Sequence, residues 1–451
     1  MRPLLIAAAA CGACAAFGQA ERAGPFLTRD EPVDWMLTAT VSLTPATEVK
    51  SRRQRSRPNL SQPQTEDINA SERFSIEQAT VFWPVAGSAA SYEVDRGSVK
   101  GTVTLGSRDT GARFAMLDTL SGGAPLHSGA AYAQWTLGPI ERAPAAGVLT
   151  VTQRIRAWRT VFDEEAAKEV SWPTGEWPKE AASSLEPMLF IDEGFEGPYT
   201  KSRVADLVDR FTRGNPRSQP PAVTAKWIAG EVIKSFRVSG QAAVSDIVRA
   251  TGRQSGRSVG AIGAINTVGA AQASQSRRGS PIDLALLLTA CYREAGLPAR
   301  VVIGYVVEPA DRGEDALQRA ERQDRAEEGL YAWVEFALYD ERESRPDRAL
   351  TWVPVDVLAM QRNNVARRPF DQPWDGFGTC EQFNEILPIG YHLHPHRLAA
   401  SAYGVSQRRE PLPGLWGWNV VPVTPQAIRQ AITLSATSAS QTSNRNTPRD
   451  R

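Results

Sequence analysis

Cysteine is scarce in this chain, which has four in 451 residues. Cys11 and Cys14 fall in an apolar N-terminal stretch, so a chain cleaved after that stretch keeps only Cys291 and Cys380. Two cysteines do not make a disulfide framework, even in an oxidising compartment. Cys291 lies on the apolar face of an expected helix, and we interpret it as a buried packing thiol.

Charge of one sign is also missing, because the formal net charge is only +1. This balance gives no electrostatic reason to expect nucleic acid or an anionic membrane as a partner. The densest basic run, Lys50 to Arg57, contains no aromatic residues, so we interpret it as a solvated loop rather than a binding surface. The prediction is therefore a protein that does not bind nucleic acid.

Long apolar runs are absent except at the N-terminus, where a short basic start precedes residues 4–17 and small residues follow. This pattern is typical of a secretory signal peptide at residues 1–20, and it is too short for a convincing membrane span. We therefore expect an exported protein, periplasmic or extracellular, with no transmembrane span after cleavage. Lipoprotein anchoring at Cys11 or Cys14 is the alternative, although neither has a bulky aliphatic residue three positions before it.

Hydrophobic patterning divides the rest of the chain. Alternation with period two, as in the run from Trp35 to Leu43, predicts a β-sandwich-like domain over residues 30–165. Residues 164–200 suit a linker, and helical patterns follow, including one whose apolar positions run from Trp227 to Phe236. We expect a core domain at 200–400, C-terminal strands at 401–437 and a disordered tail at 438–451.

The most informative stretch runs from Gly279 to Tyr305. Apolar residues recur at helical spacing from Leu284 to Ala295, Gly296 and Pro298 end the helix, and a β-branched run follows. The stretch therefore predicts a buried helix, a Gly-Leu-Pro-Ala-Arg turn and a buried strand.

This stretch resembles the core of the transglutaminase-like superfamily, which has the papain-like cysteine-enzyme fold. Two further motifs extend the resemblance: Tyr331-Ala-Trp-Val-Glu335 and Trp352-Val-Pro-Val-Asp356. In the family, a nucleophilic Cys opens the helix, a His opens the first of these motifs, and an Asp ends the second. The resemblance places Pro281 at the Cys position and Tyr331 at the His position, and only Asp356 keeps the family residue.

These substitutions remove the chemistry of a cysteine enzyme. Proline offers no nucleophile, and tyrosine, with an ordinary pKa near 10, is a poor base near neutral pH. Ser280, Pro281 and Asp283 instead form the pattern of a capping box, worth roughly 1 kcal/mol to the helix. Ser280 as a substitute nucleophile is the weaker alternative. Asp356 is placed to hydrogen-bond the hydroxyl of Tyr331.

A second candidate site is His392, His394 and His396, which alternation places on one face of a strand. Three histidines can hold Zn²⁺ with one open position. Pro395 disturbs the strand and no carboxylate lies at ligand spacing, so a polar sheet edge explains the pattern equally well. We predict no metal and no cofactor.

The sequence thus predicts an exported α+β protein with an N-terminal β-sandwich, a transglutaminase-like core and a β-rich C-terminal extension. We expect the core to be catalytically inactive and to act as a binding or scaffolding module, with an unidentified protein or peptidoglycan-side partner. The alternative is an active hydrolase, peptidase or acyl-transfer enzyme on the same fold, using Ser280 or the histidine strand.

Overall fold

The computed structural model of the protein describes most of the chain in segments. These are residues 21–45, 74–76, 78–105, 108–118, 129–143, 147–185, 191, 202–239, 247–248, 265, 267–307, 330–391, 394–395, 413–414, 416–421 and 428–438. The expected signal peptide, both of its cysteines and the expected tail beyond Ser438 lie outside the described residues. Within the described residues, no helix is long and apolar enough to span a bilayer.

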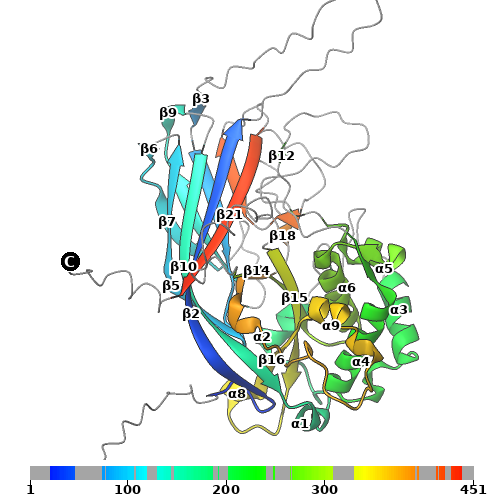
Figure 1. Ribbon diagram of the computed structural model, residues 1–451. Coiled ribbons are helices and arrows are strands. Elements are labelled where there is room, and N and C mark those ends of the chain that lie inside the picture. Colours follow the sequence, from blue (N-terminus) through cyan, green and yellow to red (C-terminus); the bar gives the residue numbers. More distant parts are fainter. Residues whose placement is uncertain are drawn as a thin grey trace, which may run out of the picture.

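Two antiparallel sheets form the β-rich half of the molecule, on the left of Figure 1. The strands of the larger sheet are β1 (Glu21–Arg22), β2 (Leu27–Pro45), β5 (Tyr92–Leu105), β6 (Arg108–Asp109), β10 (Gly147–Phe162), β12 (Ile247–Val248) and β21 (Ile428–Ser438), in the order β12-β21-β2-β10-β5-β6 with β1 on β2. The smaller sheet has the order β20 (Gly417–Val421), β4 (Gln78–Val85), β8 (Ala131–Leu137) and β7 (Arg113–Leu117).

The two sheets touch through Trp135 of β8, whose indole N–H donates to the carbonyl of Gly101 on β5 over 3.1 Å. A Cβ at Gly101 would lie 2.4 Å from the Trp135 ring, so only glycine permits this approach. Alternate residues of β10 are buried, as the period-two pattern predicts. The C-terminal part of the chain also contributes, because β21 pairs with residues Trp35 to Pro45 of β2.

The core is built on a third antiparallel sheet in the order β16-β15-β14-β17. Its strands are β14 (Ala299–Val306), β15 (Leu330–Tyr339), β16 (Leu350–Val355) and β17 (Ile386–Tyr391). Short strand pairs are β11 (Arg237–Val238) with β13 (Arg278–Gly279), β18 (His394–Pro395) with β19 (Pro413–Gly414), and β3 (Phe74–Ile76) with β9 (Ile140–Ala143). The mixed α and β content confirms the predicted fold class.

The longer helices gather beside the core sheet, on the right of Figure 1. The α-helices are α1 (Glu164–Lys168), α2 (Lys179–Ala182), α3 (Ser202–Thr212), α4 (Pro221–Ser235), α5 (Gly269–Ser276), α6 (Pro281–Glu294), α8 (Pro346–Ala349) and α9 (Val357–Arg362). The 3₁₀ turns are η2 (Ser183–Leu185), η3 (Pro216–Ser218), η6 (Val365–Arg367) and η7 (Phe383–Glu385). Helix α6 is central, since it contacts α3, α4, α5 and α9 as well as β14 and β15.

Two local expectations are wrong. The stretch expected as a linker folds onto the core as α1 and α2, with Ala167 and Val170 buried. Trp227, placed by its spacing on the apolar face of α4, is 36% exposed and packs its ring 6.3 Å from that of Phe370. Its neighbour Lys226 takes the buried position instead, because it finds polar partners there.

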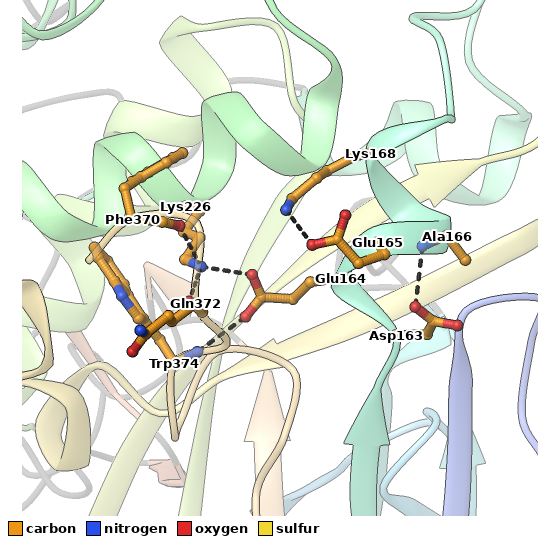
Figure 2. Close-up of polar contacts among 9 residues, drawn as sticks. All are labelled: Asp163, Glu164, Glu165, Ala166, Lys168, Lys226, Phe370, Gln372 and Trp374. Atoms are coloured by element: carbon orange, nitrogen blue, oxygen red, sulfur yellow. Dashed lines mark hydrogen bonds and ion pairs between the residues drawn. The ribbon is translucent and has the colours of Figure 1, made fainter. Parts of the chain in front are cut away.

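Lys226 forms a buried polar cluster that ties three segments together (Figure 2). Its ammonium donates to Glu164 Oε2 over 2.5 Å and to the carbonyls of Phe370 and Gln372 over 2.9 and 2.7 Å. The other oxygen of Glu164 accepts from the backbone N–H of Trp374 over 3.0 Å. Burial lowers the pKa of Lys226, and the hydrogen bond to Glu164 opposes that shift. The cluster holds α1, α4 and residues 370–374 in one arrangement.

Replacing Lys226 with Met should destabilise the protein by about 3–5 kcal/mol, because the carboxylate of Glu164 remains buried without its cation. Lys234→Met on the same helix is the matched control, since its pair with Glu231 is exposed and should contribute under about 1 kcal/mol. Urea unfolding of both variants measures the difference. Equal losses in the two variants would show that burial of the Lys226 pair has no energetic consequence.

Candidate functional site

The N-terminus of α6 is closed by the capping box that the sequence predicts. The hydroxyl of Ser280 accepts from the backbone N–H of Asp283 over 3.2 Å, and Asp283 Oδ2 accepts from the backbone N–H of Ser280 over 2.8 Å. Pro281 occupies the first helical position, where its missing N–H leaves no hydrogen bond unmade. The prediction of a helix start rebuilt around these three residues is confirmed at the level of geometry.

Asp283 also fixes the start of the neighbouring helix. Its Oδ1 accepts from the hydroxyl of Thr267 and from the backbone N–H groups of Val268 and Gly269, the latter two over 2.8 and 3.1 Å. A Cβ at Gly279 would lie 2.7 Å from the Cβ of Asp283. Only glycine therefore lets the backbone approach the Asp283 side chain this closely. One carboxylate therefore joins the first turns of α5 and α6, where helix dipoles favour negative charge.

Ser280 is fully engaged in this arrangement. Its hydroxyl donates to Asp283 Oδ2 over 2.8 Å while accepting from the Asp283 N–H, and the residue is only 9% exposed. A serine nucleophile needs its proton aimed at a base that can accept it during attack. The carboxylate of Asp283 already accepts from several other donors, so the geometry favours a cap over a nucleophile.

Tyr331 and Asp356 are brought together as the family motifs imply. The Tyr331 hydroxyl donates to Asp356 Oδ1 over 2.6 Å, and the same oxygen accepts from the backbone N–H of Ala359 and so caps α9. Burial raises the pKa of Tyr331, and the adjacent carboxylate raises it further. A phenol in this state cannot serve as a general base near neutral pH. The expected hydrogen bond is thus confirmed.

Arg362 completes this group, and the sequence did not point to it. Its guanidinium donates to the Tyr331 hydroxyl over 3.0 Å from the last turn of α9. Asp356 and Arg362 therefore sit at opposite ends of one short helix, with Tyr331 between them. Burial also raises the pKa of Asp356, although the Tyr331 hydrogen bond and Arg362 oppose the shift. The only sequence signal was a basic residue six positions after Asp356.

Helix α6 packs against the two elements that carry the other residues of the family motifs. Helix α6, which begins at Pro281, packs against both β15 and α9, the elements that carry Tyr331 and Asp356. The hydrogen bonds at the start of α6 run to Asp283 and to residues 267–269, and none of them includes Tyr331 or Asp356. The polar groups at the start of α6 bond to one another, and Tyr331 and Asp356 bond to each other.

The turn motif and the Glu of the strand motif form a buried ion pair. Arg300 donates through Nε to Glu335 Oε2 over 2.7 Å, and both side chains are at most 2% exposed. The Arg300 guanidinium also lies 4.1 Å from the ring centroids of Trp352 and Tyr391. Arg300 and Glu335 are therefore engaged by partners within the protein.

Neither described cysteine is a reactive thiol. Cys291 and Cys380 are both buried, and burial raises the pKa of each. A raised pKa leaves the thiol protonated, whereas nucleophilic attack needs the thiolate. The interpretation of Cys291 as a packing residue is confirmed.

The histidine candidate falls largely outside the described residues. His392 and His396 are not among them, and His394 is described only through the pairing of β18 with β19. Within the described part of the chain, no group of three His, Cys, Asp or Glu side chains could hold a metal ion. The alternative of a metal site at these histidines is therefore untested.

Comparison with known proteins identifies the core. The family model of the transglutaminase-like superfamily matches residues 242–357, which include α6, the turn and both strand motifs. Residues 242–357 therefore carry a transglutaminase-like core. No curated protein matches the chain.

Several solved structures resemble it at low identity. One described as a candidate cysteine protease from Cytophaga hutchinsonii has 10% identity and a TM-score of 0.45, over 92% of this chain and 93% of that one. The periplasmic domain of TgpA from Pseudomonas aeruginosa has 15% identity and a TM-score of 0.25, over 73% and 90%. A candidate protease from Parabacteroides distasonis has 10% identity and a TM-score of 0.21, over 62% and 40%.

The raised pKa of Asp356 predicts a pH dependence of stability. A carboxyl whose pKa is higher in the folded state binds its proton more tightly there, so its contribution to stability is complete below the unfolded pKa of about 4. That contribution is lost as the pH rises through the folded pKa. The wild type should therefore lose stability relative to Asp356→Asn as the pH rises from about 4.

Denaturant unfolding of the two proteins at a series of pH values from 4 to 8 checks this. The amide of the variant keeps an oxygen that can accept from Tyr331 and from the N–H of Ala359, so the difference isolates the charge. If the wild type instead became more stable than the variant as the pH rises, the hydrogen bonds to the Asp356 carboxylate would outweigh the cost of burying its charge.

Proposed function

We propose that this protein is an exported transglutaminase-like protein whose core is catalytically inactive and serves as a binding or scaffolding module. The observation that carries the proposal is the hydrogen bond from Tyr331 to Asp356. At that position the family has an imidazole, which the Asp orients. Here Asp356 accepts a hydrogen bond from the hydroxyl of Tyr331, which burial keeps protonated by raising its pKa.

The start of α6 supports the same conclusion. Pro281 stands at the family position of the nucleophile, and the hydroxyl of the neighbouring Ser280 forms the hydrogen bonds of the helix cap. A cysteine enzyme needs a thiolate and a base that takes its proton. Without a thiolate and a base at these positions, the chemical step of a cysteine enzyme could not occur. Export rests on the N-terminal pattern of residues 1–20.

The purified protein should therefore neither crosslink glutamine to amines nor hydrolyse peptides. Iodoacetamide and Ser280→Ala should leave the measured rates at background, because the buried thiols and the capping hydroxyl have no catalytic part. Turnover that disappears with Ser280→Ala would establish a serine enzyme. Turnover that disappears on adding a chelator would instead point to the histidine strand, since metal chemistry needs its ion.

Restoring the family residues provides the converse test. Pro281→Cys with Tyr331→His completes the triad, and Pro281→Ala with Tyr331→His is the matched control without a thiol. We expect both to fold with a loss of about 0.4–1 kcal/mol from the proline. The new Cys should be alkylated faster than an ordinary thiol at pH 7, because the helix N-terminus favours its thiolate.

We expect little turnover from the restored triad, since positioning of the substrate carries much of any rate. Full peptidase or crosslinking activity in the Cys variant, absent from the Ala control, would show that the substrate channel is intact. That outcome would contradict a core adapted to binding or scaffolding.

A further inference from the structure

A cavity of about 450 Å³ opens at one end of the smaller β-sheet. Its volume is in the range of small-ligand sites. Strands β4, β7 and β8 and the turns beside them supply the lining, and none of it comes from the core helices. The described lining residues are Gln78, Gly111, Arg113, Thr136, Leu137 and Gly138.

The polar lining is rich in hydrogen-bond donors. Arg113 brings a guanidinium, Gln78 an amide and Thr136 a hydroxyl, and no carboxylate is among the described residues that line the cavity. A guanidinium donates in a fork that matches the two oxygens of a carboxylate. Arg113 and Thr136 face each other in the register of β7 and β8, so the two side chains share one end of the cavity.

The backbone around the cavity is open. A Cβ added at Gly111 or Gly138 would meet no protein atom within 4 Å, so the space above both glycines is free of described atoms. Gly111 has a φ of +59°, and its N–H donates to the side chain of Asp109 over 3.1 Å, which shapes the turn into β7. A ligand can therefore approach the main chain closely at both positions.

The cavity continues into the edge of a sheet. Among the described residues, β7 is the last strand of its sheet and pairs only with β8. Arg113, Phe114 and Ala115 are exposed along it, and Phe114 is 47% exposed with its ring 5.4 Å from that of the buried Trp135. A strand edge that pairs with no other described strand is a site where an extended peptide can add as a new strand.

We propose that β7 and the cavity at its start bind the C-terminal end of an extended polypeptide. The sheet is antiparallel throughout, and β7 begins at Arg113. A peptide that adds antiparallel to β7 therefore ends beside Arg113. Its terminal carboxylate pairs with the guanidinium, its last side chain lies beside Thr136 at the mouth of the cavity, and Phe114 covers an apolar side chain further back.

This site is independent of the chemistry of the core, so the proposal stands whether or not the core is inactive. It does give the proposed binding module a kind of partner: a protein with a free, extended C-terminus. The recognition is by charge and main chain, which predicts tolerance of many peptide sequences and strict dependence on the free carboxylate.

The test uses two fluorescent libraries of random octapeptides without proline, one with free C-terminal carboxylates and one amidated. Full-length protein immobilised on beads should retain at least about tenfold more of the free-acid library. Arg113→Gln should reduce retention to the level of the amidated library. Arg154→Gln, which removes an exposed arginine from β10 and leaves the cavity unchanged, should retain as much as the wild type.

A second variant fills the cavity without removing a charge. Gly138→Leu places a side chain in space where its Cβ meets no protein atom, so we expect the fold to be kept and retention to fall to background. Thermal unfolding confirms that each variant is folded before retention is compared. Equal retention of the two libraries, or no retention of either, overturns the proposal.

Hydrogen exchange separates a strand from a simple anion site. Peptides recovered from the free-acid library should slow the exchange of backbone amides within Arg113–Leu117, because a new strand takes up those N–H groups. Inorganic phosphate at millimolar concentration should not. Binding that depends on Arg113 without protection of β7, or protection by phosphate alone, would leave an anion site and overturn the peptide assignment.

Discussion

The buried ion pair of Arg300 and Glu335 is the constraint on which the rest of the structure depends. Two charges with almost no exposure must satisfy each other and every neighbouring dipole, or the folded state loses several kcal/mol. The hydroxyl of Tyr92, from the larger β-sheet, lies 3.4 Å from Glu335 and 2.9 Å from the hydroxyl of Tyr391. The pair therefore joins β14 and β15 to a strand outside the core. The core cannot shift against the β layers without breaking a fully buried network.

The features that sequence reasoning found are local ones. Ser280 and Asp283 lie three residues apart in one helical turn, and their capping geometry follows from that spacing. Partners far apart in sequence have no such signal: Lys226 pairs with Glu164, and β21 returns to β2 from the end of the chain. Spacing alone also placed Trp227 on the buried face, because it cannot tell a lysine with buried partners from one in water. The fold of the core was therefore predictable, whereas its connections were not.

The proposed loss of catalysis is compatible with an intact framework around Pro281, Tyr331 and Asp356. Asp283 and Asp356 each accept backbone N–H groups at a helix start, and each also accepts a side-chain hydroxyl. Carboxylates in such positions stabilise helices whether or not a nucleophile or base stands beside them. A site of this kind can lose its reacting groups and keep its architecture, since the framework depends on the caps. Retention of Asp356 is thus compatible with a structural role alone.

Buried charge in this molecule is compensated within the fold, and this bears on where a partner can bind. At the Lys226 cluster and the Arg300 pair, a ligand would have to replace short internal contacts before gaining any of its own. Arg113, by contrast, is exposed and lines an open cavity, so an incoming carboxylate would not have to displace a partner of Arg113 among the described residues. Binding energy is then available in full for the new contacts and for backbone pairing along β7. The compensated interior therefore holds β7 in place, and the exposed edge of β7 leaves Arg113 available to a partner.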